Sequence, residues 1–180
     1  DLLAIGSATA TTTIGDQVPM LAKTTSSYQA TIIGVASDNG GDFSTIGNVF
    51  DKKDNPMPIA LNGRVPVKVS TEGGKIKKGD WITSSSLAGI GMKATTSGIA
   101  IGIALEDFDS ARVTTTAIVN GSEVNVGAVL VFINLGYTKI DSDLAALAAM
   151  TTDIATNAWS VDQQSGKVNV SFFGDINMQG

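Results

Sequence analysis

Short apolar runs separated by turn residues fill the first 139 positions of the chain. The clearest runs are rich in β-branched residues, as strands are. They cover residues 32–36, 65–69, 99–105, 113–119 and 124–133, and clusters of Gly, Asn and Asp stand between them at 39–42, 51–55, 62–63, 72–74 and 120–121. Many short strands with closely spaced turns are typical of all-β folds. The pattern therefore predicts a mainly β fold, a barrel or a sandwich, over residues 1–139.

Two local signals sharpen this prediction. Asn120-Gly121 stands between two apolar runs, and Asn-Gly is a strong signal for a two-residue hairpin turn. Residues 65–69 alternate between apolar and polar after Pro66, as an edge or half-buried strand would.

One pattern of residues occurs twice in the sequence. Gly15-Asp16 leads through Met20, Lys23 and Thr24-Thr25-Ser26 to Ile33-Gly34-Val35-Ala36, and Gly79-Asp80 leads through Met92-Lys93 and Thr95-Thr96-Ser97 to Ile101-Gly102-Ile103-Ala104. We expect each copy to form a turn, a polar Thr/Ser strand and an apolar strand. The shared positions hold turn residues and core aliphatics, so the duplicated β-unit indicates two halves of one scaffold. Asp16 and Asp80 are then expected at equivalent bends.

The pattern changes at Ile140. Asp141-Ser142-Asp143 supplies an N-cap and negative charge, and apolar residues then recur every three or four positions. This predicts one short amphipathic helix over residues 140–158. Two heptads are too few for an isolated coiled coil, so the helix either packs on its own barrel or forms an oligomerisation seam. The seam would use Leu144, Leu147, Thr151, Ile154, Ala158 and Trp159.

Residues 159–180 return to β-like alternation, most clearly over 167–170 and 174–178. A segment of this kind has one apolar face and no core of its own. We therefore expect a C-terminal β stalk segment, which buries that face against identical chains or against further sequence of a longer fibre chain.

Composition and charge narrow the possible partners. Hydrophobic residues make up 43% of the chain and charged residues 16%, with 20 glycines, which suits strands and tight turns. The net charge of -5 argues against binding to nucleic acid or to an anionic membrane surface. No run approaches the roughly 18 apolar residues that a membrane span requires. Asp1 opens the chain without a charged leader region, so we expect a mature fragment or an excised domain.

The chain has no cysteine and no histidine. Their absence excludes Ser-His-Asp and Cys-His catalysis, along with the commonest zinc and copper ligands. We accordingly expect no metal and no cofactor.

Glu106-Asp107-Phe108-Asp109 is the one dense acidic cluster that follows an apolar run. Glu106 and Asp107 are the candidate catalytic residues, because two carboxylates that share a proton can act as general acid and base in cleaving a peptide bond. The alternative is an ordinary solvated turn.

Other polar groups have simpler alternatives. Residues 38–42 and 51–55 carry oxygen ligands that calcium uses, without EF-hand spacing, and otherwise form plain loops. Ser84-Ser85-Ser86 would form a Ser-Lys dyad with Lys93 or Lys78, or else a turn. Arg64 is either a trimer contact or a surface arginine. A glycan-binding tip would rely on Trp81, Trp159, Tyr28 and Tyr137.

The run from Met57 to Val69, with residues 75–85 and 101–106, resembles a known domain type. This is the autoproteolytic, intramolecular-chaperone-associated domain of phage tailspikes and neck appendages, which is related to domains of large repetitive bacterial surface proteins. The resemblance covers residues 14 to about 136. It implies an extracellular, cell-surface or virion fibre that is trimeric, and a single self-cleavage next to the domain. In that family an acidic, aromatic stretch often precedes the domain, whereas this chain begins Asp1-Leu2-Leu3-Ala4.

These observations lead to a structural module of an extracellular fibre, filament or surface appendage that self-assembles as a homotrimer. The alternative is an auto-processing domain that cleaves its own chain once. A glycan-binding adhesin ranks third, because few aromatic residues are present.

Overall fold

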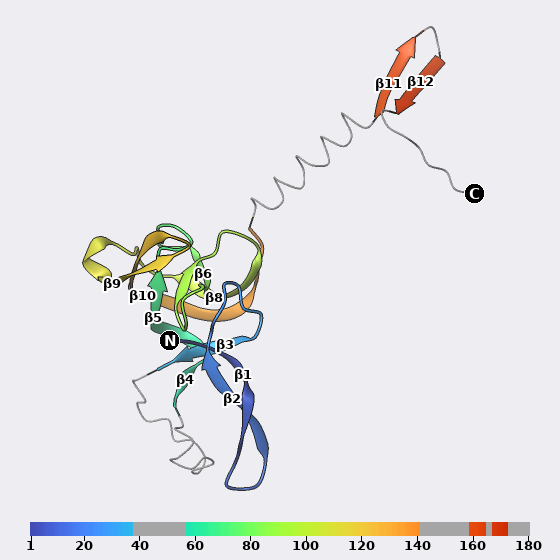
Figure 1. Cartoon of the computed structure of the whole chain (residues 1–180). Helices are drawn as coiled ribbons and strands as arrows, with labels where there is room; N and C mark the ends of the chain where they lie inside the picture. Colours follow the sequence, from blue (N-terminus) through green and yellow to red (C-terminus); the bar gives the residue numbers. More distant parts are fainter. Residues whose placement is uncertain (38–56, 141–158, 165–166, 173–180) are drawn as a thin grey trace. The chain divides into compact units, whose positions relative to one another are not determined.

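The computed structural model describes residues 1–37, 57–140, 159–164 and 167–172. It divides the chain into two compact units, Asp1–Thr138 and Lys139–Gly180 (Figure 1). The prediction of a mainly β fold is confirmed, and the helical part that is described amounts to one 3-10 turn, η2 (Ser110–Arg112).

The first sheet of the first unit holds four strands in the order β2-β1-β3-β4. All its neighbours pair antiparallel, and β1 and β2 form a long hairpin. The strands are β1 (Leu2–Thr11), β2 (Gln17–Lys23), β3 (Ile32–Ala36) and β4 (Ile59–Ala60).

The second sheet holds six strands in the order β5-β7-β6-β8-β10-β9. A further pairing of β5 with β10 closes the first five of these strands into a ring, so this sheet is a barrel with β9 as an outer extension. The β5–β7 pair is parallel and the others are antiparallel. The strands are β5 (Asn62–Ser70), β6 (Trp81–Ser84), β7 (Gly91–Lys93), β8 (Gly98–Ala104), β9 (Val113–Val119) and β10 (Ser122–Thr138).

The Asn-Gly signal identified the β9–β10 hairpin correctly. Asn120 and Gly121 have φ values of 50° and 79°, which the mirror-image hairpin turn requires, and Val119 pairs directly with Ser122. The predicted runs at 32–36 and 113–119 coincide with β3 and β9.

One apolar core serves both sheets of the first unit. Leu2 and Val35 of the first sheet belong to the same buried cluster as the inward-facing residues of the barrel. The barrel contributes Val67, Val69, Ile82, Ile101, Ala104, Val129, Val131 and Ile133, which are at most 1% exposed. Because the two sheets share this cluster, we expect them to unfold together.

The repeated pattern folds differently from the prediction in two respects. Thr24–Ser26 and Thr95–Ser97 are loops, not strands, and each loop connects two strands that flank a third: β2 and β3 flank β1, while β7 and β8 flank β6. The Gly-Asp pairs also occupy different places. Gly15-Asp16 lies in the β1–β2 hairpin turn, whereas Gly79-Asp80 precedes the central strand β6. The two aspartates are therefore not at equivalent bends.

The second unit contains one described hairpin. Strands β11 (Trp159–Gln164) and β12 (Lys167–Phe172) pair antiparallel. The predicted helix lies outside the described residues except for Ile140, and so do Leu144, Leu147, Thr151, Ile154 and Ala158 of the predicted seam. Trp159 is the first residue of β11.

Candidate functional site

Glu106, a candidate catalytic residue, follows β8 and is held by two partners. Its carboxylate pairs with both terminal nitrogens of Arg112 at 2.8 Å, and its Oε1 also accepts a hydrogen bond of 2.7 Å from the Leu130 amide. A two-pronged guanidinium contact is among the stronger charge-assisted interactions. In this structure Glu106 therefore fastens the segment after β8 to β10 and to η2.

Asp107, the second candidate, points to another part of the chain. Its Oδ2 lies 2.8 Å from Lys77 Nζ and its Oδ1 accepts 2.8 Å from the Lys78 amide. Hydrogen bonds from Lys77 and Lys78 lower the pKa of Asp107, and the same contact raises the pKa of Lys77. The two carboxylates thus bind different partners, and an acid–base role for this pair stays a prediction.

The Lys77–Asp107 contact gives a pH prediction. Because the pKa of Asp107 falls below its ordinary value of 3.8 on folding, the contact stabilises the fold at neutral pH and is lost as the pH falls through the folded pKa. Both groups are exposed, so the effect is small. We expect Asp107→Asn to melt slightly below the wild type at pH 7, with the difference vanishing once the pH has fallen through the lowered pKa of Asp107.

Lys77→Met provides the matched control, because it removes the same contact from the other side. Thermal melts of the two single variants and the double variant should show that the second substitution adds little. Fully additive effects at pH 7 would contradict the assignment.

The three serines separate into different environments. Ser84 is fully buried, and its hydroxyl donates to the Ser26 carbonyl and accepts from the Gln29 amide, both at 2.8 Å. Lys93, the proposed dyad partner, instead pairs with Asp80 at 2.9 Å. Ser84 thus connects the barrel to the first repeat's Thr/Ser loop, which is a structural arrangement.

Tyr28, named above as a candidate glycan contact, also has a structural role that was not predicted. Its backbone has φ of 53°, uncommon for a non-glycine residue, and its phenol oxygen accepts from the Thr95 and Thr96 amides at 2.7 and 3.0 Å. Partial burial raises its pKa, but the bonds from Thr95 and Thr96 outweigh this and lower it overall. Tyr28 therefore fastens one repeated loop to the other. The sequence feature related to this contact is the pair of matching Thr/Ser segments, which did not by itself indicate Tyr28.

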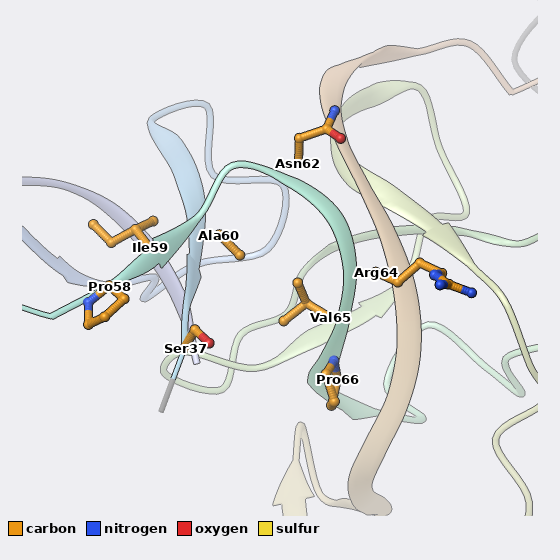
Figure 2. Close-up of a pocket in the computed structure, with 8 residues that line it drawn as sticks. All are labelled: Ser37, Pro58, Ile59, Ala60, Asn62, Arg64, Val65 and Pro66. Atoms are coloured by element: carbon orange, nitrogen blue, oxygen red, sulfur yellow. The ribbon is translucent and has the colours of Figure 1, made fainter. Parts of the chain in front are cut away.

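A shallow cavity of about 260 Å³ lies between the end of β3 and the start of β5 (Figure 2). Its walls are mostly apolar, and Asn62 and Arg64 stand at its β5 side. The lining consists of Ser37, Pro58, Ile59, Ala60, Asn62, Arg64, Val65 and Pro66. Ser37 and Pro58 adjoin residues 38–56, outside the described part of the chain, so we assign this cavity no ligand.

The β1–β2 hairpin is the most unusual surface of the first unit. Beyond Ile5 it extends past β3 and β4 as a two-stranded ribbon (Figure 1), and most of its side chains are exposed. Asp16 is the one charged residue between Leu2 and Ala22, and Ile14 at the tip is 76% exposed. Two-stranded ribbons are marginal in water on their own. This ribbon, with its single charge, is therefore the best candidate for a surface that another molecule covers.

No family model, no curated protein and no solved structure matches the chain. Within the described residues, no helix is long and apolar enough to cross a membrane, and no three acidic residues gather as metal ligands would. The candidate calcium loops at 38–42 and 51–55 lie outside the described residues.

Proposed function

We propose that this chain is a self-assembling structural module of an extracellular fibre, filament or surface appendage, with three copies in the assembly. The observation that carries the proposal is the β1–β2 ribbon: its surface carries a single charge, at Asp16, and none of the described strands pairs with its outer edges. A ribbon of this kind is stabilised when another chain adds to it.

The chemistry of the candidate catalytic residues favours a structural role. Glu106 and Asp107 are each occupied by a cation and a backbone amide. Ser84, likewise, makes hydrogen bonds to main-chain groups of another loop. In each case the polar side chain holds two distant segments together, as a rigid fibre module requires.

The resemblance to tailspike-associated domains adds the expected setting, a surface or virion fibre. Under this proposal the segment 140–158 and the adjoining Trp159 form an oligomerisation seam, and residues 159–180 continue as a stalk. The seam residues are Leu144, Leu147, Thr151, Ile154, Ala158 and Trp159. The duplicated β-unit is the scaffold that carries these assembly elements.

The direct test is the mass of the whole chain in solution by light scattering. We expect three times the 18.4 kDa of one chain at micromolar concentration, with a shift toward smaller species on dilution. A mass of 18.4 kDa at every concentration would rule out self-assembly.

A truncated chain ending at Thr138 is the companion to this test. The first unit has its own core, so the truncated chain should keep its β circular dichroism and a cooperative melt. We expect it to associate more weakly because the seam is missing. A non-cooperative melt would show instead that residues 139–180 belong to the barrel core.

A further inference from the structure

Exposed strand edges of the first unit fall into two groups. Natural sheets protect open edges with proline, charge or very short strands, because an unprotected edge recruits another strand. On β2 the edge carries Pro19 and Lys23, and β4 is only two residues long. The side of β5 that lacks a partner over residues 62–68 carries Arg64, Pro66 and Lys68. These edges are closed to strand addition.

Two other strand edges carry neither proline nor a charged residue. Past Ile5, none of the described strands lies beside the edge of β1 that faces away from β2, and residues 6–11 contain neither proline nor charge. The outer edge of β9 is the second, with the sequence VTTTAIV. The pairing register shifts between Ile5 and Thr9 on β1 and between Val113 and Thr115 on β9, and beyond these points the pairing is regular to the hairpin turns.

The two hairpins that carry these edges share a further feature. Each ends in a strongly exposed isoleucine, Ile14 at 76% in the β1–β2 turn and Ile118 at 69% near the β9–β10 turn. In Figure 1 the two hairpins lie at opposite ends of the first unit. They therefore cannot cover each other within one chain.

Resting on the proposed function, we propose that the unprotected edge of β1 in one copy adds to the unprotected edge of β9 in the next copy. The contact is head-to-tail, and such contacts close into rings or continue as filaments. Main-chain hydrogen bonds supply the affinity, as in other cases of strand addition. Ile14 and Ile118 become buried.

The distribution of charge favours a second copy of this chain as the binding partner. Each chain carries a net charge of -5, so two copies repel each other unless they meet through neutral surface. The β1 edge and β9 are both free of charged residues, and no charged residue lies between Val113 and Gly121. These are the surfaces through which two such chains approach at the smallest electrostatic cost.

The test places a charge at the centre of each edge in the whole chain. Thr9 and Thr116 are exposed, so substitutions there are expected to preserve the fold. We expect Thr9→Lys and Thr116→Glu each to weaken self-association roughly tenfold or more, measured by light scattering across a dilution series. Thr9→Lys lowers the net negative charge, so general repulsion predicts the opposite result.

The double variant Thr9→Lys/Thr116→Glu provides the decisive arm. If β1 of one copy meets β9 of the next, the opposite charges become neighbours and restore most of the association. Gln17→Lys and Gln17→Glu on the protected edge of β2 are the matched controls and should leave the mass unchanged. Circular dichroism melts check that every variant is folded.

The outcomes separate this inference from the proposed function. A monomeric wild type defeats both. An assembled wild type with unchanged Thr9→Lys and Thr116→Glu variants overturns the edge contact alone. A loss confined to Thr9→Lys, without rescue, indicates that β1 pairs with β1 of another copy and also overturns it.

Discussion

Replacing Gly102 with alanine is expected to destabilise the first unit by about 3 kcal/mol and to lower its melting temperature by about 10 °C. Gly102 lies in β8 directly opposite Ile133 of β10, in the wall of the barrel. A methyl group at Gly102 collides with the main-chain carbonyl of Phe132 and approaches the Ile133 Cα. These atoms are backbone, so they move only if the β8–β10 pairing is disturbed.

Gly136→Ala is the matched control for this prediction. Gly136 lies on β10, paired with Ala100 of β8, and a methyl group there meets nothing within 4 Å. Alanine also lowers the entropy of the unfolded chain, so this variant should be neutral or slightly more stable. Chemical denaturation of both variants measures the difference. Equal stability of the two would contradict the close approach at Gly102.

Both copies of the repeated pattern have a glycine at the corresponding position. Gly34 of β3 corresponds to Gly102, and a methyl group at Gly34 would lie 2.7 Å from the Ala60 carbonyl of β4. In both copies the glycine thus allows a neighbouring strand to approach closely. The repeat was visible in the sequence, whereas this reason for its glycine required knowledge of which strand lies alongside.

Strand prediction succeeded where side-chain pattern and backbone preference agree. β3 and β9 are short β-branched runs ended by turn residues, and Asn120-Gly121 specifies its hairpin locally. β1 gave a weaker signal, because its outer half is built from small and polar residues. Such residues form a strand here through pairing with β2, which a local pattern does not encode.

The polar contacts could not be predicted for a similar reason. Tyr28 and Thr95 are 67 positions apart, and Lys77 and Asp107 are 30 apart. Each contact depends on two loops that the barrel brings together. The acidic cluster was recognised as unusual, but its partners Arg112 and Lys77 follow from the fold and not from spacing in the sequence.

Replacing Ser84 with alanine is expected to cost about 2 kcal/mol, the second largest effect among these variants. The Ser84 hydroxyl joins β6 to the Ser26 carbonyl and the Gln29 amide, and Ser84 is fully buried. Alanine leaves both main-chain groups without this partner. The Ser84 carbonyl still accepts from the Tyr28 amide at 3.2 Å, so the loop loosens without being released.

Ser86→Ala separates this specific loss from a general effect of changing the serine cluster. The side chain of Ser86 is exposed, and its residue contacts Glu72 through the main-chain amide, which alanine retains. Its stability should therefore stay within about 0.5 kcal/mol of the wild type. In Ser84→Ala the loop that carries Tyr28 loosens, and the Thr95 and Thr96 amides then donate less to the phenol oxygen. Because these hydrogen bonds lower the pKa of Tyr28, ultraviolet titration of Ser84→Ala should show this pKa rising. Equal stability loss in both serine variants would show that Ser84 does not hold the two repeated loops together.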